Sequence, residues 1–492
     1  MTFPANDITH RPHESCGGAI SRGEWIALGV ILTAAAILRI CGIGAEALWT
    51  DESATLRAIR GGWFDVLSQY NDYENTPPLY YLLLHAFAQV FGTASDAMLR
   101  VPSVVFGLAA VVFTWVLTRQ IQSRSVSPKL SPQLQSREFN SNLAPSFAAA
   151  VVALSWPQIY FSQEARAYAM FAALAALSSV TLVRAIDRPT ASRYLAYILA
   201  AAAMNYTHFA AAGVLIAHCC YGVTALWKGS RRTRLAWIGS QAVIAMVSLP
   251  LVPIALKTRG RMLGIDSREF ASVVERFAAT FTWLAGNGWL FLPLGLLILW
   301  ALVRSRVTPA SKVLVVGLMV FPPIVPLLGW YTGGAQYFAR HALPSGLAMA
   351  VGAAIGLTAL PRRVRWPLAS VLVALAAMVY WTNRHELRKP AMREAAAFVA
   401  DHAKPGDTVV VSFMMAGWSF DRYFDRTDTR RRNYDQFTAK HVATAGEGID
   451  RVWIVLNPLP QPEAIIMKDS PLRIVGRWNF HEILVLELER SP

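Results

Sequence analysis

The stretch WIALGVILTAAAILRIC, residues 25–41, decides the class of fold. At about 1.5 Å per helical residue, such a run covers most of a hydrocarbon core about 30 Å thick. Comparable apolar runs recur along the chain, among them residues 101–117, 209–226 and 312–330. Of the 492 residues, 54% are hydrophobic and only 16% are charged, which is more apolar surface than a soluble core of this length needs. The sequence therefore predicts an all-α polytopic membrane protein.

Basic residues set the expected orientation in the membrane. The formal net charge is +15, but the Lys and Arg residues gather in short clusters between the apolar runs, which indicates a topology signal and not a nucleic-acid-binding surface. Roughly sixteen Lys and Arg residues lie in one set of alternate loops and six in the other, so we expect the first set to be cytoplasmic. Residues 1–23 are polar and carry no cleavable signal, so we expect a cytoplasmic tail before a retained anchor. The cytoplasmic clusters lie at residues 124–137, 184–193, 228–234, 304–312 and 362–365.

The number of spans depends on one short segment, Pro78 to Phe91. It is apolar for only about 14 residues, a length more typical of interfacial or re-entrant segments than of spans. We expect it to lie along the outer membrane surface, within a first outer loop at residues 44–98. The prediction is then about eleven transmembrane helices with additional juxtamembrane helices over residues 24–382.

Residues 383–492 have the composition of a soluble domain. A helix is expected from about Ala391 to His402, followed by strands at 408–412, 451–456, 472–475 and 483–488, where β-branched residues are concentrated. About a hundred residues suffice for a modest core. We predict a small α/β domain on the extracytoplasmic side.

Ionisable residues cluster on the predicted outer face, where such groups near a membrane are candidate functional residues. Asp51 and Glu52 follow the first span; one could act as a general base while the other orients or holds a cation. Alternatively, Thr50 caps a helix and both acids only favour its positive end. Glu74 precedes a proline pair, Pro77 and Pro78, that starts either a helix beside the site or an ordinary interfacial helix.

Three further outer segments carry candidate residues. Glu164 and Arg166 must lie at the membrane boundary, either in the site or paired with each other. Lys257 and Arg259 are basic where few basic residues are expected, which indicates an anionic ligand or only a solvated loop. Arg340, beside His341 at the start of a late span, could clamp a phosphate or reach toward lipid head groups.

The order of these motifs resembles that of the membrane-embedded C-superfamily of glycosyltransferases, especially the branch with protein O-mannosyltransferases and aminoarabinose transferases. The resemblance covers most of residues 24–382. It rests on Asp51-Glu52, then Pro77 to Tyr81, Leu99 to Ser103, Ser162 to Arg166, and Arg340 before Leu343-Pro344.

The resemblance implies a catalytic role for Asp51 as the base, with Glu52 as its companion. Arg340 and the outer basic loop, which contains Lys257 and Arg259, would hold the phosphate of a polyprenyl-phosphate sugar. An acceptor hydroxyl on the extracytoplasmic face would displace the lipid phosphate with inversion. The resemblance leaves open a divalent cation, Mg²⁺ or Mn²⁺, and places the protein in a bacterial-type plasma membrane.

A multi-pass transporter or lipid flippase is the alternative. Transporters show broken helices and paired repeats near the bilayer midplane. Neither is clear here, and the ionisable groups gather at one face, which suits a reaction at the membrane surface better than a conduit.

Overall fold

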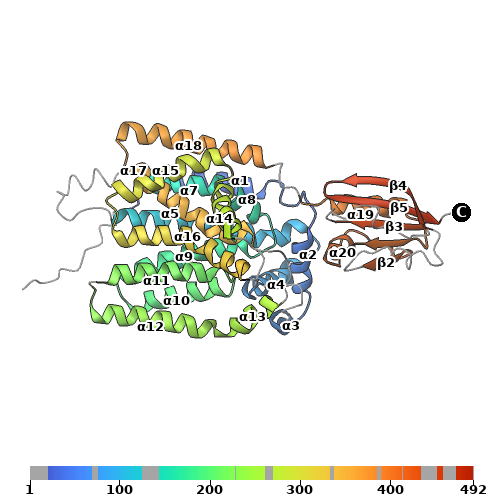
Figure 1. Cartoon of the computed structure of the whole chain (residues 1–492), viewed down its shortest axis with the longest axis horizontal. Helices are drawn as coiled ribbons and strands as arrows, with labels where there is room; N and C mark the ends of the chain where they lie inside the picture. The colour runs from blue at the N-terminus through green and yellow to red at the C-terminus, as the bar shows by residue number, and fades with distance from the viewer. Residues whose placement is uncertain are drawn as a thin grey trace, which may run out of the picture.

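The computed structural model describes residues 20–68, 76–124, 143–227, 229–260, 270–332, 337–384, 389–412, 414–433, 451–457 and 472–490. A bundle of long, roughly aligned helices carries a small sheet-containing domain at one end (Figure 1). The predicted architecture, a helical polytopic membrane protein with a C-terminal α/β unit, is confirmed. Most of the tail predicted at residues 1–23 lies outside the described residues.

The bundle is formed by helices of very different lengths. Its long and medium helices are α1 (Arg22–Ile40), α5 (Asp96–Ser123), α7 (Leu143–Leu154), α8 (Trp156–Ser162), α9 (Tyr168–Asp187), α10 (Ala191–Asn205), α11 (Ala211–Leu226), α12 (Arg231–Ser248), α14 (Phe270–Ala285), α15 (Gly288–Arg304), α16 (Pro309–Tyr331), α17 (Leu343–Thr358) and α18 (Arg362–Asn383). Shorter elements near one end are α2 (Thr50–Ala58), α3 (Trp63–Ser68), α4 (Leu79–Phe91), α13 (Val252–Gly260) and the 3₁₀ turns Leu249–Leu251 and Ala339–Ala342.

Seven helices within the described ranges are long and apolar enough to cross a membrane, or nine if each of two bent pairs counts as one span. Two shorter apolar helices, α4 and α11, lie below that length. The count of about eleven spans therefore stays a prediction. Helix α4 lies at the end of the bundle that carries the C-terminal domain, together with α2, α3 and α13 (Figure 1).

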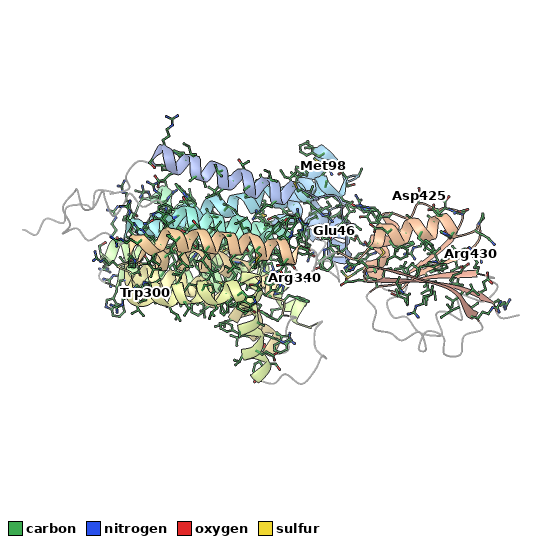
Figure 2. All side chains as sticks on the ribbon, turned by 90° about the horizontal axis from the view of Figure 1, so that it is seen from above. Glu46, Met98, Trp300, Arg340, Asp425 and Arg430 are labelled. Atoms are coloured by element: carbon green, nitrogen blue, oxygen red, sulfur yellow. The ribbon has the colours of Figure 1, made fainter. Side chains whose placement is uncertain are left out.

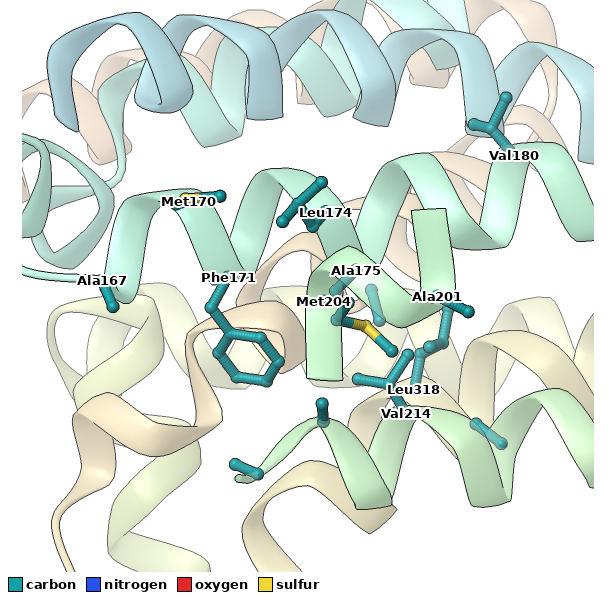
Figure 3. Close-up of a cluster of buried hydrophobic side chains, with 14 of the residues drawn as sticks. Ala167, Met170, Phe171, Leu174, Ala175, Val180, Ala201, Met204, Val214 and Leu318 are labelled. Carbon is teal, nitrogen blue, oxygen red and sulfur yellow. The ribbon is translucent and has the colours of Figure 1, made fainter. Parts of the chain in front are cut away.

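Burial separates central helices from peripheral ones. In the most apolar windows of α9 and of the segment Ala339–Thr358, which ends in α17, 78% and 83% of the residues are buried, against 22% in both α1 and α18. Without other protein to cover them, the apolar faces of α1 and α18 are available to lipid. The core around α9 includes Phe171 and Met204, which pack among side chains of α10, α11 and α16 (Figure 3).

A proline-dependent bend orients the segment that leads into the site. Helices α7 and α8 meet at 59°, and Pro157, near the start of α8, cannot donate the backbone hydrogen bond that Ala153 O would otherwise accept. The fully buried Arg39 of α1 supplies this bond from Nη1 at 3.0 Å. Its Nε also donates to Ser162 at the end of α8, at 3.2 Å. Arg39 therefore stabilises the bend and fixes where α8 ends.

A glycine makes this arrangement possible. A Cβ atom on Gly107 of α5 would lie 2.1 Å from Ser162 Oγ and 3.0 Å from Arg39 Nε. Because such distances are below van der Waals contact, a larger residue would displace α8 or the guanidinium. Gly107 thus holds α5 against the turn after α8, where the predicted site residues Glu164 and Arg166 lie.

The C-terminal domain is a five-stranded mixed sheet with helices packed on it. Its elements are α19 (Met392–His402), β1 (Thr408–Val411), α20 (Met414–Asp421), β2 (Arg430–Asn433), β3 (Arg451–Leu456), β4 (Leu472–Phe480) and β5 (Ile483–Arg490). The strand order is β2-β1-β3-β5-β4, with β1 parallel to β2 and β3, and β5 antiparallel to β3 and β4. The sequence prediction missed β2 and α20.

Asp96, at the start of α5, joins the two domains. Its carboxylate accepts hydrogen bonds from Arg393 Nη2 and Arg422 Nε, each at 2.6 Å, and from the Tyr423 hydroxyl at 2.7 Å. The same hydroxyl accepts a hydrogen bond from the backbone N–H of Leu48 at 2.6 Å. Because Leu48 lies three residues before Asp51, this interdomain contact fixes the segment that enters the site.

Candidate active site

The acidic pair lies on the first turn of α2, where carboxylates favour the positive end of the helix. Thr50 is the first residue of the helix, and the N-cap is Trp49, whose side chain makes no capping hydrogen bond. The alternative in which Thr50 caps this helix is therefore wrong. Since successive helical residues point in directions about 100° apart, Asp51 and Glu52 enter different surroundings.

Glu52 is completely enclosed by cationic groups. Its two oxygens accept hydrogen bonds from Arg100 Nε and Nη2, both at 2.8 Å, and Lys389 Nζ donates to the second oxygen at 2.9 Å. The backbone N–H of Ala165 donates to the first oxygen at 2.8 Å. Burial acts to raise the pKa of Glu52, but Lys389 and Arg100 outweigh it and lower the pKa to about 2. Glu52 is therefore ionised and holds α2, α5 and the C-terminal domain together.

Asp51 is the more accessible carboxylate. About a fifth of its side chain is exposed, and Oδ2 lies 3.3 Å from Arg340 Nη2. The guanidinium of Arg340 in turn lies over the ring of Phe338, 4.1 Å from its centroid, with Trp49 and Tyr168 farther away at 5.8 and 5.5 Å. Within the described residues, Arg340 is the side chain that bonds to this carboxylate, which leaves Asp51 able to receive another group.

Glu164 is fully buried in the turn between α8 and α9. Among the described residues, neither of its oxygens has a hydrogen-bond partner of normal geometry, although the Tyr160 hydroxyl interacts with the carboxylate both electrostatically and as a poorly aligned hydrogen-bond partner. Burial raises the pKa of Glu164 to about 7, with Lys389 and Arg340 opposing the shift. A buried carboxylate without a partner is costly in a folded protein and marks a position where a ligand can supply the missing donors.

Arg166 and His341 take different positions. Arg166 donates from Nη1 to the backbone oxygen of Asp51 at 3.2 Å and to Thr55 Oγ1 at 3.1 Å, so it braces α2. No hydrogen bond within the described part of the chain joins it to Glu164, so these two side chains do not pair with each other. The ring centroid of His341 lies 5.2 Å from that of His208 and 6.4 Å from that of Tyr168.

A cavity of about 320 Å³ joins these groups at the end of the bundle near the C-terminal domain. We call it the inner cavity. Arg340 lies at this junction, far from Trp300 in the bundle (Figure 2). Its Nε is buried and has no hydrogen-bond partner within the described residues, so the cavity presents an unused donor beside the incompletely bonded carboxylate of Glu164. The lining residues are Trp49, Tyr160, Phe161, Glu164, Trp283, Phe338, Ala339, Arg340, Lys389, Pro390 and Glu482.

Other predicted site residues cannot be placed. Glu74 lies outside the described residues, and so do the side chains of Lys257 and Arg259. The backbone of the last two belongs to α13, which lies at the same end of the bundle as α2 and α4 (Figure 1). Their roles therefore stay predictions.

Two cationic residues were missed as site residues by sequence reasoning. Arg100 belongs to a motif noted above, but nothing in its sequence neighbourhood indicates that Glu52 is its partner. Lys389 follows the last span by a few residues and gives no local signal at all. The side chain of Lys389 is 3% exposed, and its Nζ also donates to the backbone oxygen of Gln163 at 3.1 Å. The C-terminal domain thus contributes directly to the site.

The described residues contain no group of three or more His, Cys, Asp or Glu side chains arranged to hold a metal ion. Glu52, the best-enclosed carboxylate, is already occupied by two cationic side chains. A divalent cation at this site therefore stays an expectation of the resemblance alone.

Comparison with solved structures identifies the class of fold. The chain is similar to ArnT from Cupriavidus metallidurans in the apo state, with a TM-score of 0.60 and 12% identity over 94% of this chain and 98% of that chain. The same ArnT bound to undecaprenyl phosphate gives a TM-score of 0.61 with 11% identity, over 95% and 98% of the two chains. No protein-family model and no curated protein sequence matches the chain.

A second relative is more distant in architecture. The apo oligosaccharyltransferase from Archaeoglobus fulgidus gives a TM-score of 0.56 and 12% identity, over 89% of this chain and 70% of that chain. The chain therefore has the fold of the C-superfamily membrane glycosyltransferases, which confirms the resemblance inferred from its motifs. At these identities the similarity establishes the fold alone.

Proposed function

We propose that this protein transfers a sugar from a polyprenyl-phosphate lipid to an acceptor hydroxyl on the extracytoplasmic face of a bacterial-type plasma membrane. The observation that carries the proposal is the inner cavity, where an unpartnered carboxylate, Glu164, and an incompletely bonded guanidinium, Arg340, lie at one end of an apolar bundle. The ArnT structure with undecaprenyl phosphate, on the same fold, supports a lipid-phosphate ligand.

The phosphate of the donor would bind Arg340. Its Nε has an unused donor, and a guanidinium binds phosphate through two parallel hydrogen bonds. Because Arg340 Nη2 currently contacts Asp51, a phosphate that engages the guanidinium competes with this carboxylate. Donor binding would thereby release Asp51 for the acceptor. Lys257 and Arg259, on the basic segment at the same end of the bundle, would add to the binding of the phosphate.

The transfer step is a single displacement. The Asp51 carboxylate takes the proton from the acceptor hydroxyl, and the oxygen attacks the anomeric carbon of the sugar. The bond from that carbon to the phosphate oxygen breaks, and the departing polyprenyl phosphate keeps the electron pair, so the configuration inverts. Arg340 stabilises the charge that develops on the phosphate. Glu164 would accept hydrogen bonds from the sugar, which supplies the donors this carboxylate lacks.

The remaining charged groups would maintain the geometry. Glu52, held by Arg100 and Lys389, fixes the first turn of α2 and therefore the position of Asp51. Arg166 would do the same through the backbone oxygen of Asp51. Roles for Glu74 and His341 in substrate binding stay predictions. Dependence on Mg²⁺ or Mn²⁺ stays a prediction, which a titration with a chelator tests.

The test compares wild type with Asp51→Asn at matched expression. Membrane vesicles receive a radiolabelled polyprenyl-phosphate sugar fraction, and transfer of label to endogenous acceptors is measured. Loss of transfer with retained folding supports Asp51 as the base. Equal transfer removes Asp51 from that role, and the absence of any donor turnover by wild type favours the transporter or flippase alternative.

A further inference from the structure

The indole N–H of Trp49 is an unused hydrogen-bond donor of the inner cavity. Its Nε1 is buried and, among the described residues, forms no hydrogen bond. Trp49 lines the inner cavity and is the N-cap residue of α2, where its side chain makes no capping hydrogen bond. Because an indole N–H can only donate, the partner that it lacks is an acceptor. A buried donor without a partner costs free energy, which a bound ligand can recover.

An unused indole N–H is not by itself a binding site, as Trp115 shows. The Nε1 of Trp115 is also buried without a hydrogen-bond partner in the described part of the chain, and the Arg119 guanidinium lies 5.6 Å from its ring centroid. Trp115 is 3% exposed and packs in the hydrophobic core of the bundle, away from the inner cavity. Its N–H is a cost that the packing of the core offsets. The surroundings of Trp49 are what distinguish it.

The Arg340 guanidinium lies beside Trp49, with Cζ 5.8 Å from the centroid of the indole ring. The Nε of Arg340 is a second buried donor that has no partner within the described residues. Two unused N–H groups of the inner cavity therefore lie close together. An ionised phosphate accepts hydrogen bonds through several oxygens at once, so it suits two neighbouring donors.

The other charged groups of the inner cavity limit where a phosphate can lie. Glu164 and Glu482 line the same cavity, and a carboxylate repels a phosphate. Lys389 is also part of the lining, but its Nζ already donates to two oxygens of the protein, at 2.9 and 3.1 Å. The place for a phosphate is therefore beside Arg340 and Trp49.

We propose that the indole N–H of Trp49 donates a hydrogen bond to the phosphate of the lipid donor, next to the guanidinium of Arg340. This inference rests on the proposed function, because it concerns the donor of that reaction. Trp49 precedes Asp51 by two residues, so the phosphate is bound at the end of α2 that carries the proposed base. The indole adds a neutral donor to the ionic contact and thereby fixes the phosphate by direction as well as by charge.

The test removes the N–H and keeps the ring. Trp49 is replaced with benzothienylalanine, an isostere of tryptophan that has sulfur in place of the N–H, and Trp115 is replaced in the same way as the matched control. Trp49→Phe and Trp115→Phe form a second pair made of natural residues. Binding of undecaprenyl phosphate and of undecaprenol to the purified proteins is measured by thermal shift over a concentration series. Undecaprenol has the same chain without the phosphate, so the ratio of the two affinities isolates the phosphate contact.

We expect the Trp49 isostere to lose about tenfold in affinity for undecaprenyl phosphate, the loss typical of one hydrogen bond to a charged group. Its affinity for undecaprenol should stay within about twofold of wild type, and so should both affinities of the Trp115 isostere. Trp49→Phe should show the same fall in the affinity ratio, and Trp115→Phe should not. Without ligand, both isosteres should melt at or above the wild-type midpoint, because each removes a buried N–H that lacks a partner.

Equal affinity of wild type and the Trp49 isostere for undecaprenyl phosphate overturns the inference. A parallel loss for both probes also overturns it, because Trp49 would then shape the cavity for the chain, and so does an equal loss in the Trp115 isostere. A lower midpoint of the ligand-free Trp49 isostere overturns it too, because the N–H would then have a partner within the protein. Wild type that binds undecaprenyl phosphate no better than undecaprenol is a different failure. That result overturns the donor assigned in the proposed function, and the inference falls with it.

Discussion

Arg340 Nη2 lies 3.3 Å from Asp51 Oδ2, although 289 residues separate them in the sequence. The contact joins the first helix of the outer loop to the start of a late span. Each side chain keeps about a fifth of its surface exposed, so the pair is accessible to a ligand. An ion pair of this kind can be exchanged for another ionic contact at small cost, because partly exposed pairs contribute little net free energy.

This exchange predicts opposite effects of two substitutions on phosphate binding. Arg340→Met should weaken the binding of undecaprenyl phosphate, because the guanidinium that receives the phosphate is lost. Asp51→Asn should strengthen it by about 2- to 5-fold, since a competing carboxylate worth up to about 1 kcal/mol is removed. Binding to the purified proteins is measured by thermal shift over a concentration series. Equal affinity in wild type and both variants would contradict a role for this pair in donor binding.

Glu52 should matter for folding more than Asp51 does. Glu52→Gln leaves Arg100 and Lys389, both almost fully buried, without a countercharge. Breaking a buried ionic network in this way costs about 3–5 kcal/mol. We expect a lower thermal midpoint and a smaller monodisperse fraction in detergent, whereas Asp51→Asn should behave as wild type in both measurements. A midpoint for Glu52→Gln equal to that of wild type would show that the network does not stabilise the fold.

Glu164 should make stability depend on pH in the neutral range. Burial raises its pKa from 4.5 to about 7, so between these values the folded state binds a proton that the unfolded state has released. Stability conferred by this proton is therefore present at acidic pH and is lost as the pH rises through about 7. Lys389, Glu52, Arg340 and Asp51 also act on this group, but burial is the largest cause.

The comparison of wild type with Glu164→Gln isolates this contribution, because all other titrating groups are common to both proteins. We expect the thermal midpoint of wild type to fall, relative to that of Glu164→Gln, between about pH 5 and pH 8. A constant difference across that interval would mean that Glu164 does not titrate there. Binding of a ligand that hydrogen-bonds to Glu164 should reduce the fall.

Much of the fold follows from properties that are local in sequence. Apolar runs of span length gave the class of protein: α5 and α16 each contain one of the four runs, at 101–117 and 312–330, and α1 and α11 each cover most of one, at 25–41 and 209–226. Four of the five strands were predicted from β-branched segments. The strand β2, with the sequence RRRN, was missed because it has no apolar pattern and is defined by its pairing with β1.

The candidate site was predictable only in part. Asp51, Glu164 and Arg340 stand out because charges at a membrane boundary are exceptional. Their partners could not be predicted, since they depend on which distant segments meet: Lys389 reaches Glu52 across 337 residues. Likewise, Arg39 near the end of an apolar run is explained by partners on α7 and α8, among them the carbonyl group of Ala153 that the bend at α8 leaves free.

Asp96 on α5 holds the C-terminal domain beside the site. Asp96 receives three hydrogen bonds from Arg393, Arg422 and Tyr423, and the Tyr423 hydroxyl also binds the backbone of Leu48 just before α2. Asp96→Asn removes the charge that both arginines neutralise. We expect faster hydrogen exchange in α19, α20 and residues 46–51, and a loss of about tenfold in sugar transfer, because the position of Asp51 becomes less defined.

The matched control is Asp428→Asn, which removes a carboxylate from an arginine on the solvent-exposed surface of the same domain, where Arg426 is its partner. Exposed pairs contribute little, so exchange and transfer should both stay at wild-type levels. If Asp96→Asn leaves exchange in α20 unchanged, the three hydrogen bonds do not hold the domains together. If exchange rises while transfer stays at the wild-type rate, the domain contact is real but the position of Asp51 does not depend on it.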